Sequence, residues 1–340
     1  MIVDCIKKLI EKQDLTRQEA IESMTEIMDG IATPAQISSF LTALRMKGET
    51  IEEITGFVNV MRDKSIKVNP KSDDFIDTCG TGGDKLNTFN ISTTSTFVVV
   101  GAGVKVAKHG NRSASSKCGS ADVLESLGAN LNLSPESIAK CIDDVGLGFM
   151  FAPNMHPAMK NAVGPRREIG IRTIFNLLGP MTNPAGAKRQ IVGVFAAEYT
   201  EVVAEVLFNL GTQRAMVVHG LDGLDEISTL GETKITELDD AKISTYYIYP
   251  KDFGIQTASV ENLLAGDGSI EENKSALISI LEGEKGARRD ITILNAAAAI
   301  YVAGNADSIE EGIEKAKISI DDGCAIKAMN DFVKVTQELG

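Results

Sequence analysis

The segment that decides the fold is residues 75–100, which read FIDTCGTGGDKLNTFNISTTSTFVVV. The short run at 75–78 predicts a strand, and the strand leads into a turn with three glycines among residues 80–83. Glycine permits positive φ and lets a ligand approach the peptide amides closely, as in phosphate-binding turns. An isolated glycine cluster is more often an ordinary β-turn. Here, however, five of the six residues at 90–95 are polar, which is more than one helix cap requires.

Short apolar runs alternate with helical patterns from about residue 75 onward. The run at 233–249 is typical of two antiparallel strands, 233–238 and 242–249. This alternation predicts an α/β domain with a mostly parallel central sheet flanked by helices. The other candidate strands lie at 75–78, 104–108, 190–195 and 215–218, and the candidate helices lie at 135–145, 201–210, 270–282, 290–303, 308–320 and 323–338.

A small all-helical domain precedes this α/β region. Thr16, Thr33 and Thr50 are each followed three residues later by Glu or Gln, the pattern of a capping box that begins a helix. Ser308 is followed by the same pattern. About 65 residues in four short helices make a thin core. We therefore expect these helices to bury their apolar faces against the rest of the chain or against a second subunit.

Composition limits the classes of function that fit the chain. The 340 residues carry 34 Lys and Arg against 47 Asp and Glu, a net charge of −13, which argues against a broad nucleic-acid-binding surface. The sequence holds no run of 18 apolar residues, and its charged start does not resemble a signal peptide. We expect a cytoplasmic protein without a membrane span. Five scattered cysteines without CxxC argue against a zinc ribbon or a disulfide framework.

A second loop rich in anion-binding groups follows the candidate strand at 104–108. Residues 108–117 read KHGNRSASSK, with three cations, an amide and three hydroxyls in ten residues. A lone basic loop is usually solvated. In an open α/β sheet, however, ligands bind beyond the carboxyl ends of strands, and two such loops then share one edge. Together they predict a polyphosphate site.

A third loop, HGLDGLDEIS at 219–228, follows the candidate strand at 215–218. Asp225 and Glu226 are adjacent carboxylates, which repel each other unless a cation lies between them. Mg²⁺ is commonly held by one or two carboxylates together with substrate phosphates. An isolated Asp-Glu pair is usually an exposed acidic turn, but this pair lies at a third strand end. We therefore expect a metal site there.

These loops resemble the anthranilate phosphoribosyltransferase family of tryptophan biosynthesis. The resemblance is carried by GTGGD with the downstream NIST, by KHGNRSASSKCGSADVLESLG at 108–128, by HPAMKNAVGPRREIGIRTIFNLLGPMTNP at 156–184, and by HGLDGLDEIS. It extends over nearly the whole chain, including the helical start, and no motif position departs from the family pattern.

The resemblance implies an enzyme, a pentosyltransferase, that joins anthranilate to 5-phosphoribosyl 1-diphosphate. It implies a helical domain at 1–70 with a contribution from about 160–188, an α/β donor-binding domain at 71–340, and a homodimer formed through the helical domain. It also implies two Mg²⁺ ions per monomer, one held by Ser92 and Glu226 and the other by Asp225 and Glu226.

The resemblance further implies which residues bind the substrates. Gly80, Asn111 and Arg166 would contact anthranilate, and an Arg fork pairs well with a benzoate carboxylate. Arg167 is a candidate by chemistry alone. His109 and His156 are candidates for the acceptor route, although a lone histidine is more often structural. No residue is assigned as general base. The donor would be bound by Gly80, Gly83, Asp84, Thr88, Asn90, Ile91, Ser92, Thr93, Lys108, His109, Gly110, Asn111, Arg112, Ser113, Ala114, Ser115, Ser116 and Ser120.

Two other functions remain open at this point. A pyrimidine nucleoside phosphorylase shares the two-domain plan but needs no Asp-Glu metal pair. A non-catalytic relative that binds nucleic acid is disfavoured by the net charge of −13. A purely structural module would leave three chemically rich strand ends without a purpose.

Overall fold

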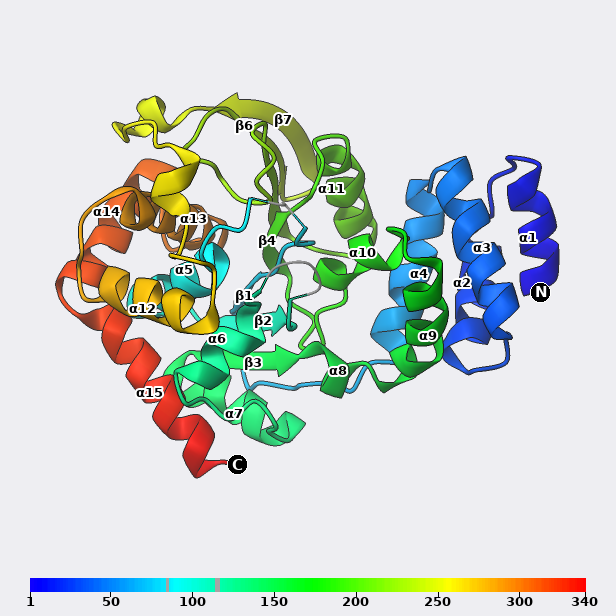
Figure 1. The fold of residues 1–340 in the computed structure, drawn as a ribbon, viewed down its shortest axis with the longest axis horizontal. Coiled ribbons are helices and arrows are strands. Elements are labelled where there is room, and N and C mark those ends of the chain that lie inside the picture. The colour runs from blue at the N-terminus through cyan, green and yellow to red at the C-terminus, as the bar shows by residue number, and fades with distance from the viewer. Residues whose placement is uncertain (84–85, 114–116) are drawn as a thin grey trace.

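The computed structural model describes residues 1–83, 86–113 and 117–340. Asp84, Ala114, Ser115 and Ser116, four of the residues expected to bind the donor, lie outside these ranges. Figure 1 shows a group of helices from the N-terminus at one end of the molecule and a larger body with a central sheet at the other.

The first four helices form the part that we call the helical region. They are α1 (Ile2–Ile10), α2 (Arg17–Met28), α3 (Pro34–Lys47) and α4 (Ile51–Asp63). The three capping boxes expected at Thr16, Thr33 and Thr50 are present, each with reciprocal bonds between the cap residue and the third helical residue. Local sequence therefore sets where α2, α3 and α4 begin.

The apolar faces of the helical region are completed by the rest of the chain. Phe40, Phe57 and other residues of α1–α4 share one buried cluster with Phe175 and Leu207, from α10 (Phe175–Leu178) and α11 (Tyr199–Asn209). Asn161, on α9 (Lys160–Ile169), donates through Nδ2 to the carbonyl of Met28 at 2.9 Å. The expectation that this thin core packs against later segments is confirmed.

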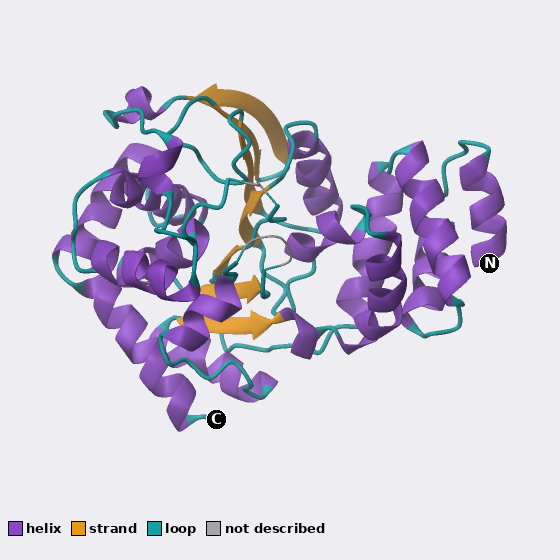
Figure 2. Cartoon of the chain, in the orientation of Figure 1, coloured by secondary structure: helices purple, strands orange, loops and turns teal. Residues whose placement is uncertain are grey.

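One sheet organises the larger body. In the described part of the chain its strand order is β3-β2-β1-β4-β5-β6-β7. The pairs from β3 to β5 are parallel, and β6 and β7 are antiparallel (Figure 2). The predicted fold class is therefore confirmed. The strands are β1 (Ile76–Thr78), β2 (Val106–Gly110), β3 (Leu147–Phe151), β4 (Arg189–Gly193), β5 (Arg214–Gly220), β6 (Thr233–Asp239) and β7 (Lys242–Ile248).

Strand β3 was not predicted from the sequence. It begins directly after Gly146, the left-handed cap of α7 (Pro135–Val145). The chain thus turns from helix to strand within one residue, without the polar segment that normally separates two elements. β3 is fixed by parallel pairing with β2, for example Phe149 opposite Lys108.

Helices cover both faces of the sheet, as Figure 1 shows. Ile191, Met216 and Val218 face a cluster that includes α5 (Ile91–Gly101) and α13 (Ala287–Val302), whereas Val192 and Val217 face the cluster shared with the helical region. No helix of the described residues is long and apolar enough to span a membrane. The remaining helices are α6 (Ser120–Ser126), α8 (Ala152–Met155), α12 (Ile270–Leu281), α14 (Ile309–Asp321) and α15 (Cys324–Glu338), with 3₁₀ turns at Pro157–Met159, Gly179–Met181, Pro250–Phe253 and Val260–Leu263.

The capping box expected at Ser308 is only half formed. The Ser308 hydroxyl accepts from the Glu311 amide, as predicted. The Glu311 carboxylate, however, accepts from the amide of Asp307 at 2.7 Å instead of from that of Ser308. The helix still begins at the expected place, because one cap bond is enough to define its start.

Candidate active site

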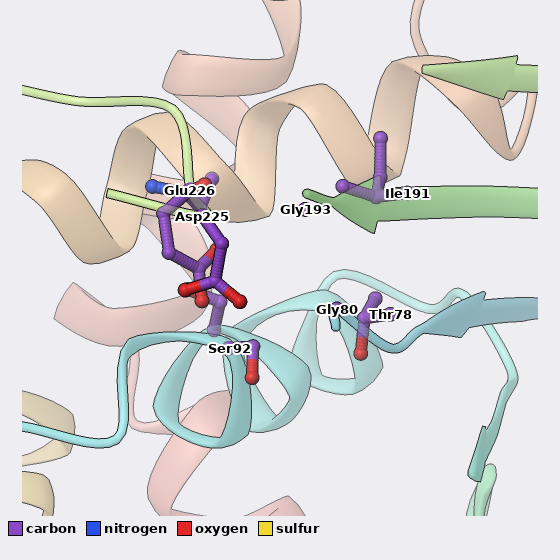
Figure 3. Close-up of a pocket in the computed structure, with 9 residues that line it drawn as sticks. Thr78, Gly80, Ser92, Ile191, Gly193, Asp225 and Glu226 are labelled. Atoms are coloured by element: carbon purple, nitrogen blue, oxygen red, sulfur yellow. The ribbon is translucent and has the colours of Figure 1, made fainter. Parts of the chain in front are cut away.

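The carboxyl ends of β1 and β4 and the loop that follows β5 meet at a cavity that also includes the start of α5. Figure 3 shows Asp225 and Glu226, from the loop after β5, facing Ser92 at the start of α5, with Gly80 next to Thr78 at the end of β1. Three segments that the sequence places far apart therefore converge, as expected for an open α/β sheet. The cavity is lined by Thr78, Gly80, Ser92, Ser95, Ile191, Gly193, Asp225, Glu226 and Asn295.

The glycine-rich turn packs directly against the acidic loop. The Gly82 amide donates to Asp225 Oδ2 at 2.7 Å, and the Thr81 amide donates to the Gly193 carbonyl at 2.8 Å. A Cβ at Gly193 would lie 1.6 Å from the carbonyl oxygen of Asp225, and one at Gly80 would lie 3.0 Å from Asp225 Oδ2. Glycine at 80 and 193 therefore allows the turn and the acidic loop to approach this closely.

Lys108 brings the second loop to the same place. It is buried on β2, and its Nζ donates to the Thr78 carbonyl at 2.6 Å, to Thr78 Oγ1 at 3.2 Å and to Ser92 Oγ at 3.5 Å. Burial lowers the pKa of the Lys108 ammonium, and the neighbouring Cys79, Asp77 and Glu226 oppose that shift. The ammonium therefore lies between the end of β1 and the start of α5.

The residue that precedes α5 does not cap the helix with its side chain. Asn90, the residue before α5, donates through Nδ2 to the Cys118 carbonyl at 3.2 Å and forms no side-chain cap bond. Thr93 Oγ1 donates to Ser120 Oγ at 3.0 Å, which joins the starts of α5 and α6. Ile91 is buried. Thr88 forms an isolated bridge with Leu264.

The described part of the 108–117 loop lies against α6 in this structure. Asn111 accepts from the Ala121 amide, and the Ser113 amide donates to Asp122 Oδ2 at 3.4 Å. Arg112 forms ion pairs with Asp122 at 2.7 Å and with Glu125 at 2.6 Å. Neither Asn111 nor Arg112 is among the described residues that line the cavity.

Three of the residues expected on the acceptor side, Arg166, His109 and His156, do not line this cavity, whereas Gly80 does. Arg166 lies on α9 with its guanidinium 5.0 Å from the centroid of the Phe175 ring, and burial lowers its pKa. The rings of His109 and His156 lie 5.0 Å apart. Burial lowers the pKa of His109 to about 3 and that of His156 to about 4, so both rings are neutral at pH 7.

Sequence reasoning missed three polar residues around this site. Asp77 is buried, accepts from Asn183 Nδ2 at 2.7 Å and from the His109 amide at 3.1 Å, and has its pKa raised to about 6 by burial. Arg172 donates to the Gly83 carbonyl at 2.7 Å. Asn295 lines the cavity from α13. Only their partners in the folded chain distinguish them, so no local pattern could have found them.

The oxygen groups of the cavity fit a hard cation. Asp225, Glu226 and Ser92 supply two carboxylates and one hydroxyl to the same space. In the described residues, no group of three or more His, Cys, Asp or Glu side chains forms a closed metal cage. This donor set suits Mg²⁺, which is usually bound by one or two carboxylates and by substrate phosphates.

Comparison with known proteins places this architecture in a family. Residues 3–65 match the family described as "Glycosyl transferase family, helical bundle domain", and residues 72–326 match "Glycosyl transferase family, a/b domain". The anthranilate phosphoribosyltransferase of Acetivibrio thermocellus is 55% identical over 336 residues, which cover 99% of this chain and 97% of that relative. The chain belongs to the anthranilate phosphoribosyltransferase family.

Solved structures of the family share the whole fold. The enzyme from Thermus thermophilus is 39% identical, with a TM-score of 0.93 over 98% of this chain and 99% of that one. The enzyme from Saccharomyces cerevisiae in complex with PRPP and Mg is 27% identical, with a TM-score of 0.90 over 99% of this chain and 98% of that one. These solved structures therefore share both the helical region and the central sheet with this chain.

Proposed function

We propose that this chain transfers the phosphoribosyl group of 5-phosphoribosyl 1-diphosphate to the amine of anthranilate, releasing diphosphate. This reaction is the second step of tryptophan synthesis from chorismate. The observation that carries the proposal is the convergence of the 80–83 turn, Lys108, Ser92 and the Asp225-Glu226 pair at one edge of the sheet. The high identity to curated family members supports the same reaction.

The donor site follows from the charge that develops during transfer. Breaking the anomeric C–O bond leaves positive charge on the ribose and negative charge on diphosphate, so fixed donors and cations near the diphosphate speed the reaction. Lys108 supplies a cation at this edge, and the start of α5, which its preceding side chain does not cap, offers backbone amides. The other residues that the family resemblance assigns to binding of 5-phosphoribosyl 1-diphosphate are also part of this proposal.

The cation supplies electrostatic stabilisation of the leaving diphosphate when it is bound. We propose two Mg²⁺ sites per monomer, one formed by Ser92 and Glu226 and the other by Asp225 and Glu226. The presence of PRPP and Mg in the Saccharomyces cerevisiae structure supports the use of Mg²⁺.

The acceptor side would position anthranilate through its carboxylate. Arg166 offers a guanidinium fork, and Asn111 and Gly80 would complete the contacts. The aromatic amine is neutral at pH 7, so its lone pair is available without a strong base. Positioning therefore supplies much of the acceleration, and we assign no general base.

We also propose that the chain forms a homodimer through the helical region, which we assign to a domain spanning residues 1–70 with a contribution from about 160–188. Large apolar side chains are exposed there: Ile10 (63%), Ile31 (67%) and Met46 (80%). Sedimentation should therefore give a species near twice 36.3 kDa. A monomer at micromolar concentration would refute the dimer. We place the enzyme in the cytoplasm, consistent with its scattered cysteines.

One assay tests the reaction. Protein mixed with anthranilate, the donor and Mg²⁺ should remove anthranilate fluorescence at a rate proportional to enzyme concentration, and diphosphate should accumulate in equal amount. Phosphorolysis of thymidine or uridine by the protein, with anthranilate unchanged, would instead support a pyrimidine nucleoside phosphorylase. Tight, salt-sensitive DNA binding without turnover would support the non-catalytic relative.

A further inference from the structure

Asn295 is a buried polar residue on a helix that is otherwise apolar over most of its length. It lies on α13, beside the run Ala296–Ala299, and only 4% of its surface is exposed. A buried amide without partners costs free energy, so a residue of this kind is retained where its hydrogen bonds matter. Asn295 also lines the cavity that contains Asp225 and Glu226.

The Asn295 amide binds the backbone of the residue that directly follows the acidic pair. Its Oδ1 accepts from the Ile227 amide at 2.9 Å, and its Nδ2 donates to the Ile227 carbonyl at 2.9 Å. The same Nδ2 donates to the Ile291 carbonyl at 2.9 Å. One side chain therefore satisfies both backbone groups of Ile227, as a neighbouring strand would, and fixes that residue against α13.

The acidic pair is thereby held between anchored positions. On one side, Asp225 packs on Gly193 and accepts from the Gly82 amide. On the other side, Ile227 is held by Asn295, and the Ser228 amide donates to Thr233 Oγ1 at 2.9 Å. Two adjacent carboxylates repel each other, so a loop that carries them needs such anchors to keep both facing one cavity.

We propose that Asn295 is a positioning residue that holds Glu226 and Asp225 in the arrangement needed for Mg²⁺-dependent binding of the donor. The proposal rests on the proposed function. Mg²⁺ demands near-ideal octahedral geometry, so a small displacement of its carboxylates is costly. Without the Asn295 amide, the buried backbone groups of Ile227 would lose their partners, and the loop would rearrange to satisfy them.

The test separates metal-dependent from metal-independent binding of the donor. Isothermal titration calorimetry would measure donor affinity with Mg²⁺ and with EDTA for the wild type, Asn295→Ala and Asn295→Leu. The leucine variant retains most of the side-chain volume, so it separates loss of hydrogen bonds from creation of a cavity. We expect the gain in affinity that Mg²⁺ provides to fall by about 10-fold or more in both variants, as for other residues that orient metal ligands. Binding in EDTA should be unchanged.

Asn273→Ala is the matched control. Asn273 is equally buried on α12, and its Nδ2 donates to the carbonyls of Gly268 and Ser269, but it does not line the cavity. This variant should lose stability while keeping the wild-type gain from Mg²⁺.

The possible outcomes distinguish a failure of the proposed function from a failure of the positioning role of Asn295. A wild type that gains no donor affinity from Mg²⁺ would contradict the proposed function itself. If Mg²⁺ raises the donor affinity of the wild type and of the Asn295 variants by the same factor, the role of Asn295 is overturned. Equal losses with Mg²⁺ and with EDTA, or failure of both Asn295 variants to fold, would assign Asn295 a structural role and would also overturn the inference.

Discussion

The helical region and the start of α5 use similar polar residues in opposite ways. Thr16, Thr33 and Thr50 each close the first turn of their own helix through a capping box. Asn90, in the equivalent position before α5, turns its side chain to the Cys118 carbonyl instead. The capping threonines of the helical region therefore close their own helices, whereas Ser92 and Ser95 in the first turns of α5 line a cavity.

Because of this difference, we expect the caps of the helical region to contribute to folding stability and the start of α5 to contribute to the reaction. A capped helix start has its amides occupied, and its residues can change with a cost only to folding. The start of α5 keeps its positive dipole end toward the cavity, beside the carboxylates of Asp225 and Glu226. Substitutions at the two kinds of site should therefore affect different measurements.

The largest effect should come from the acidic loop. Asp225→Asn combined with Glu226→Gln removes both negative charges from the cavity while nearly preserving side-chain volume. We expect kcat to fall by about a thousandfold or more, with a changed Mg²⁺ requirement, because the leaving diphosphate loses its cation. Steady-state rates over a Mg²⁺ titration measure this. An unchanged Mg²⁺ dependence would remove the metal role from this pair.

Arg166 should show a large effect that is confined to one substrate. Arg166→Ala removes the guanidinium proposed to hold the anthranilate carboxylate. KM for anthranilate should rise by about 10- to 100-fold, the usual cost of losing a charged hydrogen bond, while KM for the donor changes little. Initial rates with each substrate varied in turn give both values. Equal rises in the two KM values would contradict the assignment, and Arg167→Ala is the matched control on the same helix.

A pair of small substitutions tests the comparison itself. Ser92→Ala at the start of α5 should raise KM for the donor by about tenfold and leave stability nearly unchanged. Thr16→Ala should lower the free energy of unfolding by about 1 kcal/mol through loss of a cap and leave kinetics unchanged. Urea unfolding and initial rates on both variants measure this. If each variant affected both measurements equally, the two kinds of helix start would not differ as described.

The last effect concerns the pH dependence of stability. Burial lowers the pKa of His156 from 6.5 to about 4. Between these values the unfolded chain binds a proton that the folded chain does not, so stability is full above pH 6.5 and is lost as pH falls toward 4. His156→Gln should reduce the dependence of unfolding free energy on pH by about one proton in this window. Urea unfolding at several pH values measures the slope. An unchanged slope would mean that His156 is accessible to protons in the folded state.

Local signals explain what the sequence could predict. The capping boxes of the helical region could be predicted because all their hydrogen bonds lie within four residues of sequence. The strands that lead into the three loops were found because apolar runs followed by glycine or polar groups are local patterns. Their convergence followed from the general rule that parallel strands place their carboxyl ends at one edge.

What was missed depends on contacts between distant residues. β3 is defined by pairing with β2 and lacks a preceding polar segment. Asn295 and Ile227 are 68 positions apart, and Arg172 meets Gly83 across 89 positions. Arg112 carries the charge expected of a donor-binding residue, yet in this structure it pairs with Asp122 and Glu125. No pattern in one sequence reports which of these partners a side chain will find.

A crystal of the protein grown with 5-phosphoribosyl 1-diphosphate and Mg²⁺ tests the central claim most directly. The account predicts diphosphate over the 80–83 turn and the start of α5, and Mg²⁺ at about 2.1 Å from oxygens of Asp225, Glu226 or Ser92. Donor bound elsewhere in the molecule, with that edge of the sheet empty in the same crystal, would contradict it.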